Sequence, residues 1–101
     1  MKDNFLQFLG IAKKAGMLAE GYNKCEELIN NKKLYLMILS DDVSQNTKEK
    51  FTNYCSNENI FLLEGYSKEE LGKILGRDEI NLLGIKNVII AKKLKDLWWK
   101  I

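Results

Sequence analysis

Hydrophobic residues recur along the chain at two spacings, one that suits helices and one that suits buried strands. Near the start, four of them lie at positions i, i+3, i+4 and i+7, on one side of a helix: Phe5, Phe8, Leu9 and Ala12. Three later runs are hydrophobic almost without interruption: residues 34–39, 60–63 and 80–85. Such runs are typical of strands that are covered on both faces. The pattern therefore predicts helices packed against a central sheet.

Capping residues indicate where the helices begin and end. Ser67 precedes Glu70 by three residues, which is the spacing of a capping box at the start of a helix. Gly16 and Gly76 follow helical segments at positions where glycine commonly ends a helix. These signals predict helices at residues 3–15, 23–30 and 44–57, one that begins at Ser67 and stops at Gly76, and one that follows Lys86 and Asn87. A short strand is predicted at residues 17–19.

Strands and helices alternate along the chain after an additional helix at the start, residues 3–15. This order predicts the α/β class, with a largely parallel central sheet and helices on both faces. The length of 101 residues leaves room for one domain, which we place at residues 1–101. In open sheets of this kind, binding sites gather where strands end and helices begin.

The composition is that of an ordinary globular protein. Hydrophobic residues make up 46% and charged residues 30%, which excludes an intrinsically disordered chain. The first residues contain no hydrophobic run long enough for a signal peptide or a membrane span, so we expect a cytoplasmic protein with no membrane partner. Cys25 and Cys55 lie far apart on hydrophobic helical faces, and we interpret them as small buried residues.

The sequence lacks the residues that most catalytic sites require. The chain has no histidine, which removes the commonest general base, histidine-based zinc sites and the Ser-His-Asp and Cys-His triads. Gly16 and Gly21 do not have the spacing of a glycine-rich phosphate loop. The sequence contains no evident acid–base pair and no nucleophile with a base. We therefore expect a protein that is not an enzyme and uses no cofactor.

Asp41 and Asp42 leave one alternative open, because they follow a predicted strand. Carboxylates in that position hold magnesium in receiver-type phosphorelay domains, and Lys86 also follows a strand as that interpretation requires. A receiver domain further needs a lone acceptor aspartate after another strand, where this chain has only Glu64. Ser44 or Asp42 can equally cap the next helix. A magnesium-binding receiver-like domain is the less favoured alternative, and we assign no metal ligand.

The stretch from Lys13 to Glu27 is the strongest candidate for a binding site. It ends one helix and begins another at Gly21, Tyr22 and Asn23. A helix that begins after a glycine exposes unpaired N–H groups and the positive end of its dipole, which suit a phosphate or a base edge. Three lysines add positive charge around it: Lys13, Lys14 and Lys24. The alternative is that Asn23 only caps the helix, with Glu26 as its capping-box partner.

Basic residues are concentrated at the two ends of the chain. Residues 1–33 carry six basic and four acidic groups, residues 34–83 carry five and nine, and residues 84–101 carry five and one. If the two ends meet in the folded chain, they form a basic face of the kind that attracts nucleic acids. The net charge is only +2, which is low for a strong nucleic-acid binder.

Two adjacent tryptophans, Trp98 and Trp99, lie in the predicted last helix. We expect Trp98 to pack in the core. Trp99 is left to stack on a nucleic-acid base or on a partner chain. A protein-interaction module that uses the end of this helix is therefore the first alternative to nucleic-acid binding.

Several short motifs follow one another in a recognisable order. The most specific are Ala15-Gly16-Met17-Leu18 followed by Gly21, then Ser40-Asp41-Asp42-Val43 after a strand, and Leu71-Gly72 followed by Gly76. This order resembles the kink-turn-binding ribosomal protein superfamily of the archaeal L-seven-Ae and eukaryotic L-thirty-e type, and especially its bacterial YlxQ-like branch. The resemblance covers nearly the whole chain.

The resemblance implies a three-layer α/β/α sandwich with a mixed four-stranded central sheet. It also implies an RNA-binding face, built from the start of the second helix, the start of the fourth helix and the loop after it. Family members place a Gly-x-Asn-Glu run, with a lysine three residues later, against the sheared G·A pairs of a bent RNA. Gly21 and Asn23 match this run. Lys68 matches a lysine near the start of the fourth helix, and Arg77 to Ile80 match the loop that covers the protruding base.

Two positions depart from the family pattern. The family glutamate is Lys24 here, and the family lysine is Glu27. Lysine offers only hydrogen-bond donors, so Lys24 cannot accept a hydrogen bond from a guanine edge as a glutamate can. Lys24 and Glu27 are three residues apart on a helix, where opposite charges are placed to pair with each other.

We therefore predict a non-enzymatic, monomeric RNA-binding protein whose partner is a structured or ribosomal RNA, with a ribosomal or other protein as a further partner. Backbone amides and lysines would bind phosphates, Asn23 would contact a base edge, and Ile80 would cover an unstacked base. The predicted RNA-binding residues are Lys13, Lys14, Gly21, Tyr22, Asn23, Lys24, Glu27, Lys68, Arg77 and Ile80.

Overall fold

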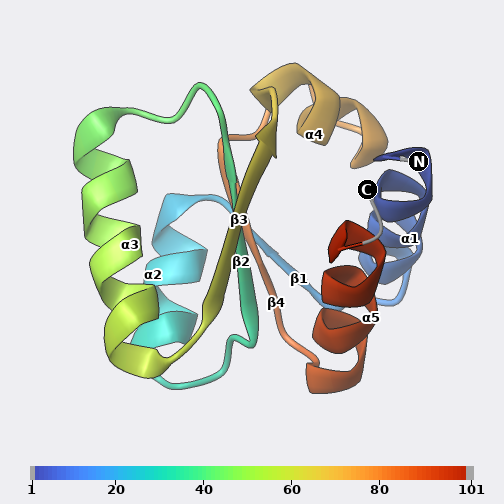
Figure 1. The fold of residues 1–101 in the computed structure, drawn as a ribbon. Helices are drawn as coiled ribbons and strands as arrows, with labels where there is room; N and C mark the ends of the chain where they lie inside the picture. The colour runs from blue at the N-terminus through green and yellow to red at the C-terminus, as the bar shows by residue number, and fades with distance from the viewer. Residues whose placement is uncertain (1, 100–101) are drawn as a thin grey trace.

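A four-stranded sheet separates two helical layers in the protein (Figure 1), which we describe over residues 2–99 from a computed structural model. The elements are α1 (Lys2–Lys14), β1 (Leu18–Glu20), α2 (Tyr22–Asn30), β2 (Leu36–Ser40), α3 (Gln45–Glu58), β3 (Phe61–Tyr66), α4 (Lys68–Ile74), β4 (Leu82–Ile85) and α5 (Val88–Trp99). Helices α2 and α3 cover one face of the sheet, and α1 and α5 cover the other, with α4 packed against α1. This arrangement confirms the predicted three-layer α/β/α sandwich. Within residues 2–99, no helix is long and apolar enough to cross a membrane.

The sheet is mixed, with the strand order β1-β4-β2-β3. β2 pairs with β3 in parallel, whereas β4 runs antiparallel to both of its neighbours, β1 and β2. This confirms the mixed four-stranded sheet that the family resemblance implied. The largely parallel sheet that we predicted from the alternation of strands and helices is wrong.

The lengths of the connecting helices explain the direction of β4. α3 has 14 residues and is about 21 Å long, so it returns the chain along the sheet and β3 runs parallel to β2. α4 has only 7 residues and is about 10 Å long, which is too short to return along β3, a strand of 6 residues and about 20 Å. β4 therefore begins at the edge where β3 ends and runs in the opposite direction.

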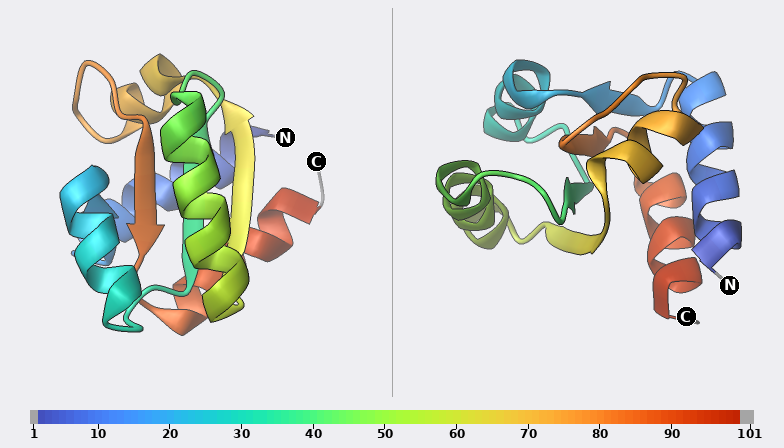
Figure 2. Two further views of the ribbon diagram at one scale, coloured as in Figure 1. Left: turned by 90° about the vertical axis from the view of Figure 1, so that its left-hand side faces the viewer. Right: turned by 90° about the horizontal axis from the view of Figure 1, so that it is seen from above.

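The reversed strand gathers four junctions at one edge of the sheet, which lies in the upper half of Figure 1 and faces the viewer in the right-hand view of Figure 2. They are the β1–α2 junction, the β2–α3 loop, the β3–α4 junction and the α4–β4 loop, residues 75–81. We call this side of the molecule the loop edge. Any site built at the loop edge therefore combines residues that are far apart in the sequence.

Hydrogen bonds from Ser40 hold the residue that precedes the last strand against the end of β2. Its backbone N–H donates to the carbonyl oxygen of Asn81 at 2.7 Å, and its hydroxyl donates to the Asn81 side-chain oxygen at 2.9 Å. β4 begins only at Leu82, so Ile80 and Asn81 belong to the α4–β4 loop and not to the strand predicted at residues 80–85. The loop is thus fastened to the end of β2.

The capping signals predicted at Ser67, Gly16 and Gly76 are confirmed. Ser67 and Glu70 form the capping box of α4, with hydrogen bonds of 3.0 and 2.9 Å between side chain and backbone. Ser44 or Asp42 was predicted to cap the helix that follows them. The structure has Ser44 as the N-cap of this helix, α3. Gly16 and Gly76 follow α1 and α4 at φ angles of 73° and 74°, a region that favours glycine.

Side chains alternate between the two faces of β2 and build two hydrophobic clusters. Leu36 and Ile38 pack toward α1 and α5, whereas Met37 and Leu39 pack toward α2 and α3. The second cluster also contains both cysteines as buried free thiols, which confirms the interpretation made from the sequence: Cys25 and Cys55. Burial raises the pKa of each thiol to about 12, so both remain protonated at neutral pH.

The two tryptophans lie at the end of α5. The ring of Trp98 contacts Phe5 and Tyr66 at centroid distances of 5.4 and 5.6 Å, which confirms that Trp98 packs against the core. Trp99 is the last residue of α5, but its side chain lies outside the described part of the structure. The role predicted for Trp99 therefore stays a prediction.

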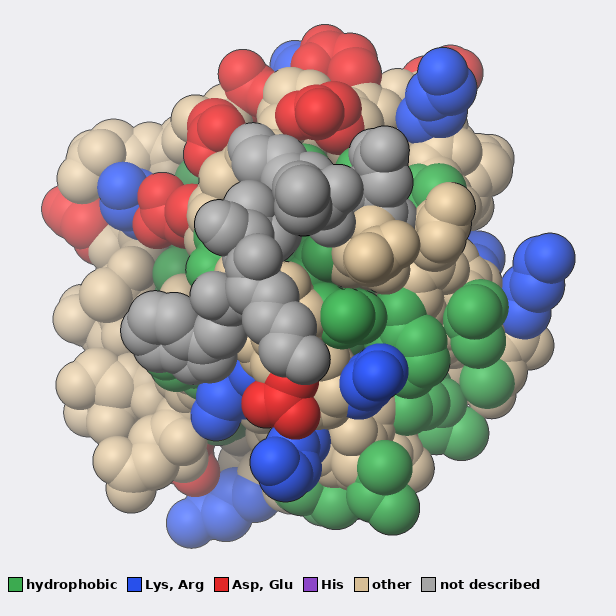
Figure 3. Space-filling view, turned by 45° about the vertical axis from the view of Figure 1, so that its right-hand side comes forward, with side chains coloured by type: hydrophobic (Ala, Val, Ile, Leu, Met, Phe, Trp, Pro, Cys, Tyr) green, Lys and Arg blue, Asp and Glu red, His purple; other side chains and the backbone are tan. Residues whose placement is uncertain are grey.

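The two basic ends of the chain meet, because α1 and α5 pack side by side. The face that they form is mixed in character. Figure 3 shows lysine side chains on this face with hydrophobic side chains between them. Ile11 on α1 is exposed, as are Val88 and Ile89 at the start of α5. The ends therefore meet as the predicted basic face required, but hydrophobic side chains share the face with the lysines.

Gly72 allows the α4–β4 loop to lie directly against α4. A Cβ atom at this position would lie 2.6 Å from the Cα and 2.8 Å from the backbone nitrogen of Glu79. The carbonyl oxygen of Gly72 accepts a hydrogen bond from the backbone N–H of Arg77 at 2.9 Å, which holds the loop in place. The position of the loop therefore depends on the missing side chain at residue 72.

We expect Gly72→Ala to lower the free energy of unfolding by about 1–3 kcal/mol, because the new methyl group would overpack against backbone that cannot rotate away. Gly10→Ala in α1 is the matched control. A Cβ at Gly10 would lie 3.6 Å from the nearest atom, a side-chain carbon of Ile74. This variant should gain about 0.5–1 kcal/mol from helix propensity. Urea denaturation measures both, and an unchanged stability of Gly72→Ala would contradict the close approach.

Candidate nucleic-acid interface

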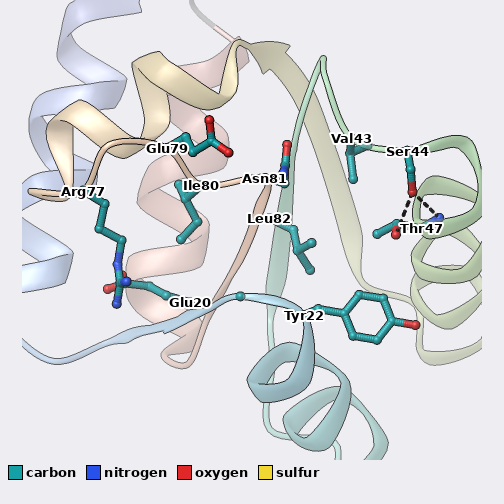
Figure 4. A pocket seen from close by; sticks show the side chains of 11 residues that line it. Glu20, Tyr22, Val43, Ser44, Thr47, Arg77, Glu79, Ile80, Asn81 and Leu82 are labelled. Atoms are coloured by element: carbon teal, nitrogen blue, oxygen red, sulfur yellow. Dashed lines mark hydrogen bonds and ion pairs between the residues drawn. The ribbon is translucent and has the colours of Figure 1, made fainter.

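The loop edge contains a pocket of about 420 Å³ (Figure 4). Four predicted RNA-binding residues line it: Gly21, Tyr22, Arg77 and Ile80. The other lining residues come from β1, the β2–α3 loop, α3, the α4–β4 loop and β4: Glu20, Val43, Ser44, Thr47, Glu79, Asn81 and Leu82. In Figure 4, Ile80 and Leu82 lie near the centre, between the Arg77 side and the Tyr22 side. The pocket is thus a product of the sheet topology.

α2 begins at the pocket without a side-chain cap. Its N-cap is Gly21, at a φ angle of 93°. The interpretation that Asn23 caps the helix is wrong, because the chain turns into the helix earlier. Gly21 follows the last residue of β1 and is tied to β4 by a 3.1 Å hydrogen bond from its N–H to the carbonyl of Leu82, and its positive φ makes the turn. Asn23 is the second residue of α2, with an exposed side chain.

Glu26 does not reach back to Asn23 as a capping-box partner. Its carboxylate accepts hydrogen bonds from the hydroxyl of Tyr54 and the ammonium of Lys50, both at 2.7 Å. The hydrogen bond to Glu26 raises the pKa of Lys50, so this ion pair is charged over the physiological pH range. The pair fastens α2 to α3. The N–H groups in the first turn of α2 therefore remain at the positive end of the helix dipole with no side-chain cap.

Tyr22 forms one wall of the pocket and is held from behind. Its ring contacts Phe51 of α3 edge-on, with the ring centroids 5.2 Å apart. The ammonium of Lys50 lies 5.2 Å from the centroid of the Tyr22 ring, a distance at which a cation is attracted to an aromatic face. These contacts fix the orientation of a half-buried aromatic ring that borders the pocket.

Glu20 binds two of the predicted cations at once. One carboxylate oxygen accepts a hydrogen bond from the ammonium of Lys13, and the other accepts from Nε of Arg77. The Glu20 side chain is 10% exposed. Burial by itself would raise the pKa of Glu20, but the hydrogen bonds and charges of Lys13 and Arg77 outweigh it and lower the pKa below the ordinary 4.5. Glu20 is therefore ionised at neutral pH and joins α1, β1 and the α4–β4 loop.

Two further ion pairs involve predicted RNA-binding residues. Lys24 and Glu27 lie 3.9 Å apart on α2, which confirms that these two residues pair with each other. The ammonium of Lys68 lies 3.4 Å from a carboxylate oxygen of Glu79. Lys14 is exposed at the end of α1 and takes part in no ion pair with the side chains that the structure describes. Most of the positive charge predicted for this face is therefore neutralised locally.

The structure brings most of the predicted residues to the loop edge, although not all of them to the pocket. The carbonyl oxygen of Lys68 accepts a hydrogen bond from the N–H of Ile80 at 3.0 Å, which joins the start of α4 to the loop. Ile80 lines the pocket but is only 7% exposed, so it forms a fixed wall. Lys13 does not line the pocket, but it binds Glu20, which does. Glu27 lies on the exposed side of α2.

Sequence reasoning missed Glu20, although the sequence carries one signal for it. Glu20 is the only acidic residue between Asp3 and Glu26, in a stretch that holds three lysines. A single carboxylate among cations is a candidate for binding several of them. The other missed residues carry no such signal, because they meet only when β4 pairs with β1 and β2: Val43, Ser44, Thr47, Asn81 and Leu82.

Asp42 has a structural role at the loop edge. Its carboxylate accepts a hydrogen bond at 2.9 Å from the backbone N–H of Lys68, at the start of α4. Glu64, the other acidic group that the magnesium alternative would need, pairs with Lys48 at 3.3 Å. Within the described residues, no group of three or more metal-binding side chains lies close enough together to hold a metal ion.

Proteins of known sequence and structure are similar to the chain over most of its length. The RNA-binding protein YlxQ of Enterococcus faecium is 29% identical over 92 residues, which cover 91% of this chain and 88% of that protein. The RNA-binding protein YlxQ of Bacillus subtilis (strain 168) is 27% identical over 89 residues, with coverage of 88% and 89%. The solved structure of a protein of unknown function from Bacillus halodurans C has a TM-score of 0.89 and 29% identity, and it covers 92% of this chain and 94% of that one.

A family model extends this similarity to the candidate site. The model of the ribosomal protein L7Ae/L30e/S12e/Gadd45 family matches residues 3–96. This range includes the whole sheet, α2, α3, α4 and every residue that lines the pocket. The chain therefore belongs to the ribosomal protein L7Ae/L30e/S12e/Gadd45 family, in its bacterial YlxQ-like branch.

Proposed function

We propose that this chain is a non-enzymatic RNA-binding protein that recognises structured RNA at the loop edge. The observation that carries the proposal is the pocket beside the uncapped start of α2, because it joins a place for a base with a place for a phosphate. The two YlxQ relatives, both named RNA-binding proteins, support the same role. We propose a ribosomal or other structured RNA as the partner of a cytoplasmic, monomeric protein.

The pocket has a size and lining that suit a single nucleobase. Its volume of about 420 Å³ is in the range of pockets for small ligands. The ring of Tyr22 and the side chains of Ile80 and Leu82 offer surfaces on which a base can pack. Only an unstacked base, from a loop or a bend, can enter such a pocket, because bases in a regular duplex are stacked and paired. The protein should therefore prefer bent or looped RNA to duplex RNA.

Donors around the pocket supply the phosphate contacts. The first-turn N–H groups of α2 suit a phosphate oxygen, and Lys14, Lys24, Lys68 and Arg77 add cationic groups. Three of these four cations already pair with carboxylates, so a phosphate would replace or share an ion pair. The net electrostatic gain is therefore modest. Affinity should depend more on the shape of the RNA than on its charge.

We expect Asn23→Ala combined with Lys68→Ala to weaken binding to a kink-turn RNA by about tenfold to a hundredfold, since a lost base contact is worth roughly 1–3 kcal/mol. The lost phosphate contact should also reduce the salt dependence of binding by about one unit of slope. Asn23 is exposed and does not cap α2, so the melting temperature should change little. Fluorescence anisotropy over a series of salt concentrations measures affinity and slope together.

The matched control combines Asn53→Ala with Lys93→Ala, an exposed asparagine on α3 and an exposed lysine on α5 that lie outside the loop edge. It removes the same chemical groups and should leave binding nearly unchanged. A straight duplex of the same length is the second RNA. Equal, weak binding of the unmodified protein to both RNAs would contradict recognition of structured RNA.

Tyr22→Leu should weaken binding of the same RNA through the loss of base stacking, which is worth roughly 1–3 kcal/mol. A fluorescent 2-aminopurine at the protruding position of the RNA reports the environment of that base directly. The control is Tyr54→Leu, because Tyr54 also packs edge-on against Phe51 but does not line the pocket. If both variants change the 2-aminopurine signal equally, a packing defect and not base stacking would explain the loss.

A further inference from the structure

One carboxylate at the loop edge connects three segments that are distant in the sequence. Glu20 is the last residue of β1, Lys13 lies in the last turn of α1, and Arg77 lies in the α4–β4 loop. Each oxygen of the carboxylate has its own cation, Lys13 on one and Nε of Arg77 on the other. The arrangement is nearly buried at its centre and exposed at its rim, because Glu20 is 10% and Arg77 54% exposed.

The Arg77 side chain spans one side of the pocket. In Figure 4 it reaches from the α4–β4 loop toward Glu20 and borders the pocket opposite Tyr22. Its backbone is held separately, by the hydrogen bond from its N–H to the carbonyl of Gly72. An arginine carries five N–H donors. Glu20 binds the one on Nε, and no other described residue hydrogen-bonds the terminal amino groups.

We propose that Glu20 is a positioning residue for RNA recognition. It holds Arg77 across the side of the pocket, with the terminal amino groups of the guanidinium presented to a phosphate beside the inserted base. The proposal rests on the proposed function of the loop edge. It adds a cause of selectivity: the preference for bent RNA over duplex depends on a carboxylate that itself contacts no RNA.

The physical reason is preorganisation. An arginine on an exposed loop samples many rotamers, and ordering it on binding lowers affinity. The bond to Glu20 orders the guanidinium before RNA arrives, and the planar fork can then bind a phosphate through its remaining donors. Only an RNA whose backbone turns at the pocket places a phosphate there. A straight duplex gains nothing from the fixed orientation.

Simple charge arithmetic predicts the opposite effect. A carboxylate near a polyanion repels it, so removal of Glu20 should strengthen the binding of every RNA. The positioning role predicts that removal weakens the binding of bent RNA and leaves or strengthens that of duplex. The two views therefore predict different changes in one measurable ratio, the affinity for kink-turn RNA divided by the affinity for duplex. Simple repulsion leaves this ratio nearly unchanged, whereas the positioning role predicts that it falls.

The first measurement needs no RNA. Arg77 is the only arginine of the chain, so its Nε–H gives one unambiguous cross-peak in a proton–nitrogen spectrum. We expect this proton to exchange slowly with water in the unmodified protein, because it is bonded to Glu20. Glu20→Met keeps the length of the side chain and removes the acceptor. It should speed the exchange, and an unchanged rate would overturn the proposal.

The second measurement is the affinity ratio. Glu20→Met should lower the ratio about tenfold, the effect of one charge-assisted hydrogen bond. Glu64→Met is the matched control, because Glu64 pairs with Lys48 at 3.3 Å and lies on β3, outside the pocket. It removes the same charge and should leave the ratio unchanged. In an Arg77→Ala background, Glu20→Met should have no further effect on the ratio. Melting temperatures identify any loss of fold.

The outcomes separate this inference from the proposed function. A preference for kink-turn RNA that survives Glu20→Met unchanged would overturn the positioning role and leave RNA recognition at the loop edge standing. Stronger binding of both RNAs by Glu20→Met would overturn it in favour of simple repulsion. No preference in the unmodified protein would overturn the proposed function, and the positioning role with it. A lowered ratio together with faster Nε–H exchange supports both.

Discussion

The position of β4 between β1 and β2 determines where everything else in this molecule lies. β4 is hydrogen-bonded to both neighbours and runs against both of them. Because it runs in that direction, the α4–β4 loop joins the ends of β1, β2 and β3 at one edge of the sheet. The pocket requires this gathering, since its residues come from β1, the start of α2, the β2–α3 loop, α3, the α4–β4 loop and β4. Gly72 then lets the loop lie against α4, and Ser40 fastens it to the end of β2.

Charge at the loop edge is organised in pairs and not as a uniform basic surface. Lys13 and Arg77 share Glu20, while the nearby lysines of α2 and α4 have carboxylates of their own. Such pairing suppresses long-range attraction for any polyanion and therefore indiscriminate binding. It also keeps long cationic side chains ordered. The small net charge of +2 is thus compatible with a protein that selects RNA by shape.

Local features of the fold could be predicted from the sequence, and features that depend on distant pairing could not. The capping box at Ser67 and the helix end at Gly76 follow from a few adjacent residues, and both are confirmed. The largely parallel sheet predicted from the alternation of strands and helices was wrong, because alternation alone favours parallel pairing and does not show that β4 is reversed. The seven residues of α4 were the missed clue, since a helix so short cannot return the chain along the sheet.

The residues of the candidate site also fall into those that local sequence signals predict and those that depend on distant pairing. The start of α2 was predicted because a glycine before a helix is a local signal, although Asn23 was open to interpretation as its cap. The wall formed by Ile80 was matched only through the family resemblance, and its burial depends on the whole sheet. Glu20 could be understood only when Lys13 and Arg77 were seen beside it. A carboxylate that binds two partners, one of them 57 residues away, leaves no periodic pattern in the sequence.

The departures from the family pattern at Lys24 and Glu27 change two side chains of the proposed interface and leave the backbone at the start of α2 unaffected. The two side chains pair with each other at 3.9 Å, so the exchange of charges leaves the sum at this position unchanged. The first-turn N–H groups of α2 and the positive φ of Gly21 belong to the backbone, and neither depends on residue 24. The backbone features on which the proposed shape recognition rests are therefore retained. In the proposed interface, the exchange at residue 24 would change the base edge that can be read. Lysine donates where glutamate would accept, and this favours acceptor groups such as guanine O6 and N7 or a phosphate.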